Sequence, residues 1–588
     1  MNDLSSGKWN NHITNIIMKN TALILLSLLL FVSCAGNEKV NEQREVTPIP
    51  HLEKRGDVTQ LIVEGKPYLA LAMELTNSAA SSREYMKPYW PQLKEAGVNT
   101  VLAVVSWEMV EPEEGKFDFK VVDELIEDAR ANDLKLALLW FGSWKNGYTS
   151  YTPKWVKRDT RRFPLALTKD GKQLSILTTL AKSSWEADAK AYGELMKHIA
   201  EVDREEQTVI MMQVNNEVGL HGYTRDYHPE AVKAFNGPVP QALTDYLVAH
   251  KEQLLPETRA AWEQQGCRTA GTWEEVFGKG DYTDEMFMAW HYARYMNAIA
   301  QAGKEVYPIP TFVNAWIVQP EDKHPGNYPA GGPQAQVHDI WRAAAPAIDI
   351  LSPDIYLPDY PTIINMYARA GNPVFVPESR AGQEGAANAA YTIGQMGGIG
   401  YSPFGVERSI AAPGNESFRQ FYQLAGSAAD LILEAQAKGN ITATWVKALN
   451  PTRLKDEVVM GDYKLVYELV SSGQRKGGAP QRLGGTYAPD AQGYAIAIQQ
   501  ADDAFLFLGS NIRVQFLPAD GKGVVVGLAK TTEGRFEDGK WIEGRWLNGD
   551  DIQLRYDLLP AADEGFSGQG LDFAKPNPQF LKVELYKY

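Results

Sequence analysis

A chain of 588 residues, 44% hydrophobic and 11% aromatic, is long enough for two or three globular domains with a large core. Its 73 Asp and Glu outnumber its 58 Lys and Arg, and the net charge of −15 at pH 7 argues against a nucleic-acid partner, because a phosphate backbone needs a basic surface. We therefore expect a globular protein without a nucleic-acid partner.

Residues 1–34 have the pattern of a secretory signal. The segment MKNTALILLSLLLFVSC, residues 18–34, has a lysine followed by an apolar run that is too short to span a membrane as a mature helix. We take Met18 as the true start, because residues 1–17 add nothing to this pattern. Residues 35–55 are polar and contain proline, which predicts a tether between the signal and the folded protein.

The signal ends at Cys34 in the stretch FVSC, which resembles the lipobox of bacterial lipoproteins, where the cysteine becomes the lipidated first residue. Cys267 is the only other cysteine, and a disulfide between the two would tie a flexible leader to the body, so lipidation of Cys34 is the favoured explanation. This predicts export across the inner membrane to the periplasm, outer membrane or cell surface, with membrane contact only through the lipid. An ordinary signal with an unrelated cysteine is the alternative.

Residues 56–445 alternate apolar runs of strand length with segments of helical periodicity. Eight such alternations predict an α/β fold of the (β/α)₈ barrel type, a TIM barrel, because each parallel strand needs a crossover helix. Residues 218–281, rich in Trp, Pro and Gly, predict an insertion in this barrel. The expected strands are 67–75, 99–107, 134–141, 208–217, 309–316, 348–356, 373–379 and 399–405.

The sequence changes character after a helix that we expect at about 416–438. Residues 446–588 contain short alternating apolar and polar stretches broken by Gly, Asp and Asn. This pattern is typical of antiparallel strands joined by tight turns. It predicts a C-terminal all-β domain that resembles a β-sandwich.

Two glutamates end predicted strands of the barrel. Glu217 closes the apolar stretch TVIMMQVNNE, and Glu378 closes VFVPES. The carboxyl ends of all barrel strands open on one face, so the two side chains are expected to meet there. Two facing carboxyl groups, one protonated and one ionised, are the minimal equipment for cleaving a glycosidic bond.

Aromatic and polar side chains end most of the other strands, where aromatic rings could stack on the apolar faces of sugars. We predict that these residues bind the substrate: Glu74, Trp107, Trp140, Trp144, Asn216, Asn314, Trp316, Tyr356 and Phe404. The alternative is that the tryptophans fill the core between strands and helices, and that each glutamate is merely solvated or ion-paired.

Other chemistries lack their motifs in this sequence. It contains no His-Glu-x-x-His motif and no cysteine cluster for zinc, no Gly-rich phosphate loop after a strand, and no Gly-x-Ser-x-Gly nucleophile elbow. We therefore expect neither a metal nor a cofactor.

The segment SWEMVEPEEGKFDF (106–119), with NNE (215–217) and PES (377–379), resembles the β-galactosidase-type retaining glycoside hydrolases of families 35 and 42. The resemblance implies that Glu217 is the acid/base and Glu378 the nucleophile. It also implies that Asn216 binds the sugar 2-hydroxyl and that Tyr356 hydrogen-bonds the nucleophile. Family 35 usually carries Gly-Glu-x-His-Tyr on its first strand, and AMELTNS here keeps only the glutamate.

These observations predict a retaining exo-glycosidase that removes terminal β-galactosyl residues from oligosaccharides or polysaccharides. Because the first-strand motif differs, an arabinosidase, a β-mannosidase or a β-glucanase remains an alternative. A non-catalytic carbohydrate-binding protein is the alternative from another class, and the presence of both strand-end glutamates argues against it. The oligomeric state is left open.

Overall fold

The computed structural model describes residues 47–470, 491–521, 524–552, 569–573 and 577–588. The predicted signal with Cys34, and most of the predicted tether, lie outside the described residues, so lipidation and export stay predictions. The tether prediction is corrected at its end, because β1 (His51–Arg55) pairs with β2 (Val58–Val63). Among the described residues, no helix combines the length and the apolar character needed to cross a membrane.

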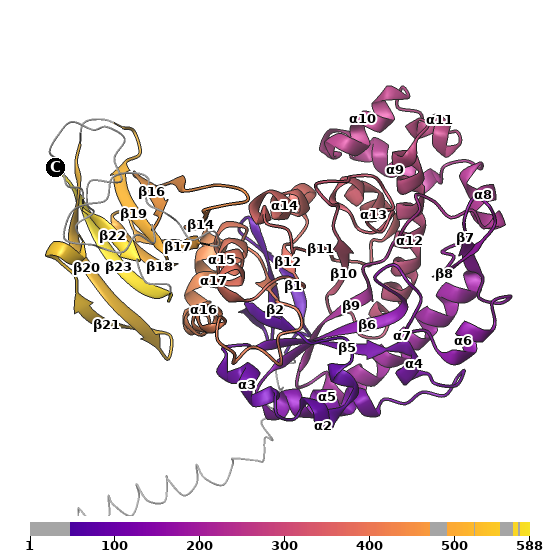
Figure 1. Cartoon of the computed structure of the whole chain (residues 1–588), viewed down its shortest axis with the longest axis horizontal. Coiled ribbons are helices and arrows are strands. Elements are labelled where there is room, and N and C mark those ends of the chain that lie inside the picture. Colours follow the sequence, from indigo (N-terminus) through magenta and orange to yellow (C-terminus); the bar gives the residue numbers. More distant parts are fainter. Residues whose placement is uncertain (1–46, 471–490, 522–523, 553–568, 574–576) are drawn as a thin grey trace, which may run out of the picture. The chain divides into compact units, whose positions relative to one another are not determined.

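Eight parallel strands form the predicted barrel (Figure 1). They are hydrogen-bonded in the order β11-β10-β9-β6-β5-β4-β13-β12, and a parallel bridge between Asp354 and Glu378 joins the two ends of this row. All eight expected strands are therefore confirmed. Their bounds are β4 (Ala70–Glu74), β5 (Thr100–Ser106), β6 (Lys135–Lys145), β9 (Val209–Asn216), β10 (Thr311–Trp316), β11 (Ile350–Asp354), β12 (Phe375–Val376) and β13 (Gly400–Tyr401).

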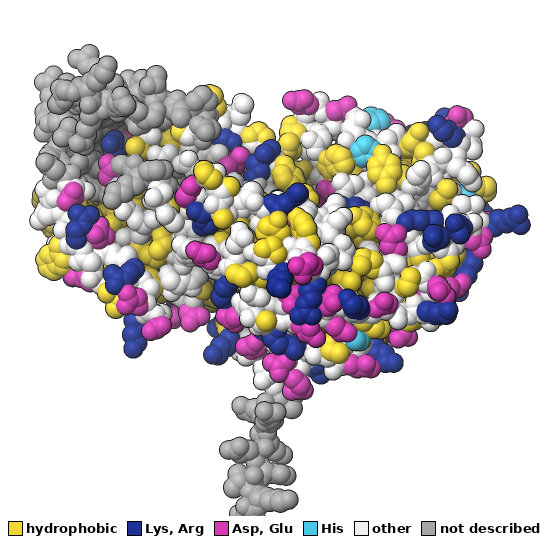
Figure 2. Space-filling view, turned by 60° about the horizontal axis from the view of Figure 1, so that its bottom comes forward, with side chains coloured by type: hydrophobic (Ala, Val, Ile, Leu, Met, Phe, Trp, Pro, Cys, Tyr) yellow, Lys and Arg dark blue, Asp and Glu magenta, His cyan; other side chains and the backbone are white. Residues whose placement is uncertain are grey.

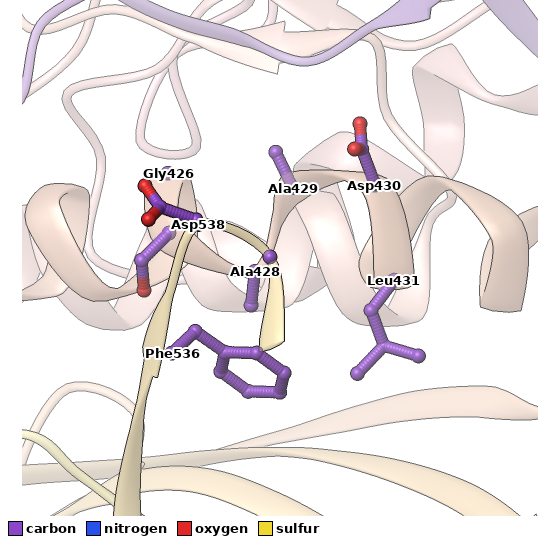
Figure 3. Close-up of a pocket in the computed structure, with 9 residues that line it drawn as sticks. Gly426, Ala428, Ala429, Asp430, Leu431, Phe536 and Asp538 are labelled. Carbon is purple, nitrogen blue, oxygen red and sulfur yellow. The ribbon is translucent and has the colours of Figure 1, made fainter. Parts of the chain in front are cut away.

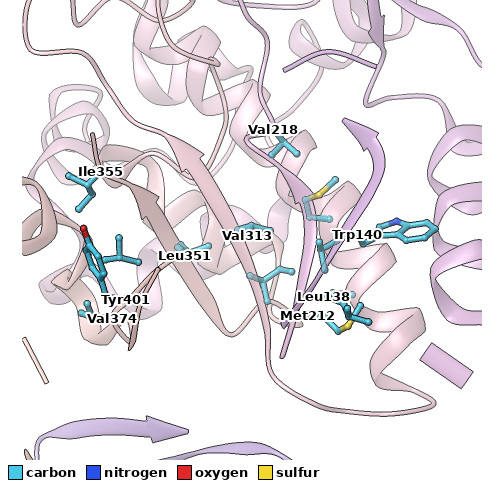
Figure 4. Close-up of a cluster of buried hydrophobic side chains, with 14 of the residues drawn as sticks. Leu138, Trp140, Met212, Val218, Val313, Leu351, Ile355, Val374 and Tyr401 are labelled. Atoms are coloured by element: carbon cyan, nitrogen blue, oxygen red, sulfur yellow. The ribbon is translucent and has the colours of Figure 1, made fainter. Parts of the chain in front are cut away.

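The strands are apolar on both sides because both sides are covered. Inside the barrel, aliphatic and aromatic side chains such as Ala72, Leu139 and Phe312 form one cluster, and Leu61 of β2 joins it from the small sheet of β1, β2 and β3 (Lys66–Tyr68). Outside the barrel, the alternate side chains pack against the helices, as Figure 4 shows for Leu138, Trp140 and Met212.

Helices connect each strand to the next, as the alternation of the sequence predicted. The crossover between β9 and β10 is the longest, because four short helices precede its main helix within the predicted insertion. Those helices are α8 (Pro229–Phe235), α9 (Gln241–Ala249), α10 (Pro256–Gln264) and α11 (Trp273–Phe277). The principal crossover helices are α3 (Trp90–Glu95), α5 (Lys120–Ala131), α7 (Lys182–Asp203), α12 (Asp281–Lys304), α13 (His338–Ala344), α14 (Tyr360–Tyr367) and α15 (Gly382–Ala390).

Two antiparallel sheets form the C-terminal domain, which follows α16 (Glu416–Ser427) and α17 (Ala429–Lys438). Its first strand begins at Ile441, slightly before the predicted boundary. One sheet has the order β14-β17-β18-β23-β20-β21 and the other β15-β16-β19-β22. The strands are β14 (Ile441–Lys447), β15 (Lys455–Met460), β16 (Tyr463–Leu469), β17 (Gln492–Ala501), β18 (Ala504–Ser510), β19 (Ile512–Pro518), β20 (Val526–Glu537), β21 (Lys540–Trp546), β22 (Gly570–Phe573) and β23 (Gln579–Lys587).

The C-terminal domain shares buried side chains with the barrel. Trp445 of β14 belongs to the outer barrel core, and its indole N–H donates to Asn388 Oδ1 at 3.1 Å. A cavity of about 270 Å³ lies where the α16–α17 junction meets the β20–β21 turn, beside Phe536 and Asp538 (Figure 3). None of the carboxyl groups at the ends of the barrel strands lines it. On the face shown in Figure 2, acidic and basic side chains are interspersed rather than gathered by sign.

Candidate active site

The carboxyl ends of β9, β11 and β12 bring three carboxyl groups together. Glu217 follows β9, Asp354 ends β11, and Glu378 lies two residues beyond β12. Each contributes an oxygen, and these three oxygens lie within 4.8 Å of one another. The two glutamates singled out by the sequence therefore do meet at one place, with Asp354 as a third member.

The backbone at the end of β9 turns both Asn216 and Glu217 toward this cluster. In a regular strand, neighbouring side chains point to opposite faces. Here Asn215 and Glu217 have left-handed φ angles of 57° and 44°, which interrupt that alternation at a cost in backbone energy. Asn215 Oδ1 accepts from the backbone N–H of Trp144 at 2.8 Å, and the Glu217 N–H donates to Asn314 Oδ1 at 2.9 Å.

Three donors hold the carboxyl group of Glu378. The Tyr356 hydroxyl donates to Oε2 at 3.0 Å, the contact that the family resemblance implied. The side-chain amide of Asn216 donates to Oε1 at 3.2 Å, and that of Asn314 approaches the same oxygen at 3.4 Å. Donors aimed at both oxygens stabilise the ionised carboxylate and fix its orientation.

Glu217 is in a different electrostatic environment. Burial raises the pKa of Glu217 to about 8, and the negative charge of Glu378 adds to the rise. Only 7% of Glu217 and 5% of Glu378 is exposed. Burial also raises the pKa of Asp354, again with Glu378 contributing, and Asn314 Nδ2 donates to Asp354 Oδ2 at 2.7 Å. A glutamate with a raised pKa thus lies beside a glutamate whose two carboxyl oxygens accept hydrogen bonds from three side chains.

Lys145, at the end of β6, supplies positive charge to this cluster. Its ammonium group donates to Asn216 Oδ1 at 2.9 Å, and 9% of the residue is exposed. Burial alone would lower the pKa of Lys145, but the surrounding carboxyl groups outweigh burial and raise it. These groups are Glu378, Glu217, Glu74 and Asp354.

We expect Lys145→Met to lower the free energy of unfolding by about 3 kcal/mol at alkaline pH, because it leaves buried carboxylates without a neighbouring positive charge. The loss should shrink in mildly acid solution, where the carboxyl groups take up protons. Lys157→Met is the matched control, since Lys157 pairs with Glu108 at 2.9 Å on the surface and should contribute less than about 1 kcal/mol. Denaturant unfolding at several pH values measures both. Equal losses for the two variants would contradict the assignment of Lys145 to the cluster.

Glu74 points into the barrel interior, as Ala70 and Ala72 of the same strand do. It is fully buried at the end of β4, and neither carboxyl oxygen has a hydrogen-bond partner among the described residues. Burial raises the pKa of Glu74 well above the ordinary value, and the charge of Glu378 adds to this. The prediction that Glu74 contacts substrate is therefore corrected: its carboxyl group is buried, with no surface exposed to solvent.

Three of the four predicted sugar-binding tryptophans are core residues. Trp107, Trp140 and Trp144 are fully buried and belong to the outer barrel core. The Trp107 indole donates to Glu111 and the Trp140 indole to Asp188, while Trp144 packs edge-on against Tyr295. Figure 4 shows Trp140 pointing away from the barrel interior. The core-filling alternative is correct for these three.

Trp316, Tyr356 and Phe404 are the predicted binding residues that remain partly exposed. Trp316 ends β10 and lies beside His221, with ring centroids 5.2 Å apart; Tyr148 lies on the other side of His221 at 5.9 Å. These three rings follow the adjacent strands β10, β9 and β6 and form the exposed aromatic edge of the site. Asn216 and Asn314 are buried and orient the carboxyl groups.

The sequence reasoning missed Lys145, Asp354, His221 and Tyr148. Asp354 could have been predicted from the sequence, because it is a carboxylate at the end of an expected strand. Lys145 could not, because β6 continues four residues beyond its predicted end through an irregular register between Trp140 and Lys145.

Two segments of this chain match known protein-family models. Residues 77–296 match the glycoside hydrolase 42 family model, described as β-galactosidase, and residues 418–558 match a domain of unknown function. The first match includes Glu217 and ends before Glu378.

Two curated relatives are β-galactosidases. BbgII of Bifidobacterium bifidum is 29% identical over 170 residues, or 26% of this chain and 22% of that protein. BgaA of Thermus sp. is 26% identical over 169 residues, or 26% of this chain and 24% of that protein. The matches thus span less than a quarter of either relative. A crystal structure of a β-galactosidase from Bacillus circulans sp. alkalophilus aligns with 62% of this chain and 57% of its own, at 15% identity and a TM-score of 0.40.

Proposed function

We propose that this chain, whose residues 77–296 match the β-galactosidase family of glycoside hydrolases, cleaves glycosidic bonds with Glu217 as acid/base and Glu378 as nucleophile. The observation that carries the proposal is the pair itself: a glutamate with a raised pKa and a glutamate held by three donors, with oxygens within 4.8 Å of each other. General acid catalysis needs the first state and nucleophilic attack needs the second.

The spacing favours retention of configuration. Retaining enzymes hold their two carboxyl groups about 5 to 5.5 Å apart, whereas inverting enzymes leave roughly 6.5 to 9.5 Å for a water molecule. The short oxygen separation between Glu217 and Glu378 fits the first class. In the first step a Glu378 oxygen bonds to the anomeric carbon while Glu217 gives its proton to the departing oxygen. In the second step Glu217 takes a proton from water, which attacks the same carbon and releases Glu378.

Terminal β-galactosyl residues are the substrate that we propose. The sugar assignment rests on the matched relatives, which are β-galactosidases. Exo action is supported by the low exposure of both glutamates, since a deeply set pair admits a chain end more readily than a chain middle. The ring of Trp316 offers an apolar surface on which a sugar face could stack.

A panel of nitrophenyl glycosides tests the proposed activity. We expect the highest kcat/KM for the β-galactoside, compared with β-mannoside, β-glucoside and α-arabinoside. A preference for another sugar would change the proposed substrate but not the proposed mechanism. Failure to cleave every member, by a protein that melts cooperatively, would overturn the proposal and favour a non-catalytic carbohydrate-binding role.

The pH dependence of kcat/KM should report the proton on Glu217. Because its pKa is raised to about 8, Glu217 stays protonated through neutral pH, and activity should fall as pH rises through that value. The decline should be steep for an alkyl β-galactoside, whose leaving group needs the proton, and shallow for a dinitrophenyl β-galactoside. Initial rates between pH 4 and pH 10 provide the comparison. Identical alkaline limbs for the two substrates would rule out Glu217 as the acid.

A further inference from the structure

A cavity of about 1030 Å³ is lined partly by the loops that follow β10 and β11, and we call it the side groove. Its walls are the loop after β10 (318–328), the loop after β11 (357–359) and one face of α14. Asn450 and Pro451, from the turn after β14 of the C-terminal domain, also line it, as do Glu257 of α10, Tyr282 and Glu285 of α12, and Gln336. Pockets for small ligands commonly measure about 300 to 1,000 Å³, so the side groove has room for more than a single sugar ring.

Two residues that line the side groove are close along the chain to residues of the candidate active site. Val318 in its wall is two residues beyond Trp316, and Leu357 directly follows Tyr356, whose hydroxyl holds Glu378. When the terminal sugar of a glycoside lies at Glu217 and Glu378, the remaining sugars can therefore reach the side groove.

The lining combines apolar surface with acidic groups. Apolar and aromatic side chains supply flat surfaces, among them Tyr282, Tyr328, Ile363 and Met366. Four carboxyl groups and one lysine line the same cavity: Glu257, Glu285, Glu321, Asp359 and Lys323. Glu257 is paired with Arg369 at 3.2 Å, and burial raises the pKa of Glu285 to about 7, so Glu321 and Asp359 are the carboxylates free to repel an anion.

One carboxyl group is built into the groove. Glu285 is 1% exposed, and the amide of Gln336 donates to its oxygens at 3.3 Å and to the Tyr328 hydroxyl at 3.1 Å. Glu321 is exposed and Asp359 is partly exposed, and each lies on one of the two loops. Carboxylates accept hydrogen bonds from sugar hydroxyls and repel anions, so this lining suits a neutral glycan and disfavours uronic acids or sulfated sugars.

The geometry points to the side groove as the binding site for the neutral oligosaccharide that carries the terminal sugar. This inference rests on the proposed function and deepens it: the substrate is the end of a neutral glycan several sugars long, in preference to a disaccharide or an acidic glycan. The C-terminal domain then contributes to substrate binding through Asn450 and Pro451.

Galactobiose, galactotetraose and galactohexaose, all β-1,4-linked, test the inference directly. We expect kcat/KM to rise by roughly tenfold from the disaccharide to the tetraose, and to fall again when the reducing end of the tetraose is oxidised to an aldonate. Thr362→Trp and Met366→Trp, which fill the groove from α14, should remove the gain with length while changing kcat/KM for nitrophenyl β-galactoside less than twofold. Val202→Trp, at an exposed position of α7, is the matched control and should change neither.

Nitrophenyl β-galactoside distinguishes a failure of the side-groove inference from a failure of the proposed function. If nitrophenyl β-galactoside is cleaved but all three oligosaccharides give the same kcat/KM, or if the tryptophan variants keep the gain with length, the side groove is not the binding site. If no galactoside is cleaved at all, the proposed function itself fails. As a second route, Glu321→Lys combined with Asp359→Lys should raise kcat/KM for the aldonate relative to the neutral tetraose, and an unchanged ratio would also overturn the inference.

Discussion

Glu378→Gln is expected to abolish hydrolysis of every glycoside, with a fall in kcat of about 10⁴-fold or more. The replacement keeps the shape of the side chain and an oxygen that can accept from the Tyr356 hydroxyl. It removes the negative charge that attacks the anomeric carbon, so neither a good nor a poor leaving group can be displaced. Steady-state rates on nitrophenyl and alkyl β-galactosides measure the effect.

The matched control for this variant is Glu384→Gln. Glu384 lies on α15, six residues further along the chain, and pairs with Lys447 at 3.3 Å outside the cluster. It should keep nearly full activity. A Glu378→Gln protein that unfolds normally and retains more than a few per cent of wild-type kcat would show that another group performs the attack.

Glu217→Ala is expected to separate the two chemical steps. Hydrolysis of alkyl β-galactosides should fall by roughly 10² to 10⁴-fold, the usual contribution of general acid catalysis. A dinitrophenyl leaving group departs without a proton, so the glycosyl-enzyme on Glu378 should still form from that substrate and then accumulate. Added azide, an anion that needs no general base, should enter the space left by the side chain and release a galactosyl azide of retained configuration.

The reverse pattern would exchange the two roles. If azide restored turnover to Glu378→Ala and gave an azide of inverted configuration, while leaving Glu217→Ala unchanged, Glu217 would be the nucleophile. Lys145→Met offers an internal check, because it alters the charge of the cluster without removing either carboxyl group and should give no azide product.

The barrel was predictable because its strands are buried on both sides and therefore stand out as apolar runs. The two glutamates were predictable because a parallel barrel collects the ends of its strands on one face. The side of the barrel wall that each tryptophan faces was not predictable, and β6 shows the reason. Leu138 and Trp140 face the helices while Leu139 and Phe141 face the barrel interior, yet all four are apolar. When both faces are covered, alternation cannot tell which side chains point inward.

The supporting groups of the site were harder still to predict. Asn216 and Glu217 face the same cluster only because residues with left-handed φ angles interrupt the strand geometry. No sequence pattern predicts that interruption. Lys145 reaches the cluster because β6 runs past its apolar core through an irregular register. Glu74 ends its strand as Glu217 ends β9, but it stays inside the barrel, so residue type and strand position alone do not distinguish a buried carboxyl group from a catalytic one.

The identity of the nucleophile is tested most directly by trapping it. Incubation with dinitrophenyl 2-deoxy-2-fluoro-β-galactoside, followed by proteolysis and mass spectrometry, locates any sugar that becomes covalently attached. The account predicts a single labelled peptide that contains VFVPES, with the fluorosugar on Glu378. A label on Glu217 or Glu74, or turnover that yields an inverted sugar with no labelled peptide, would contradict it.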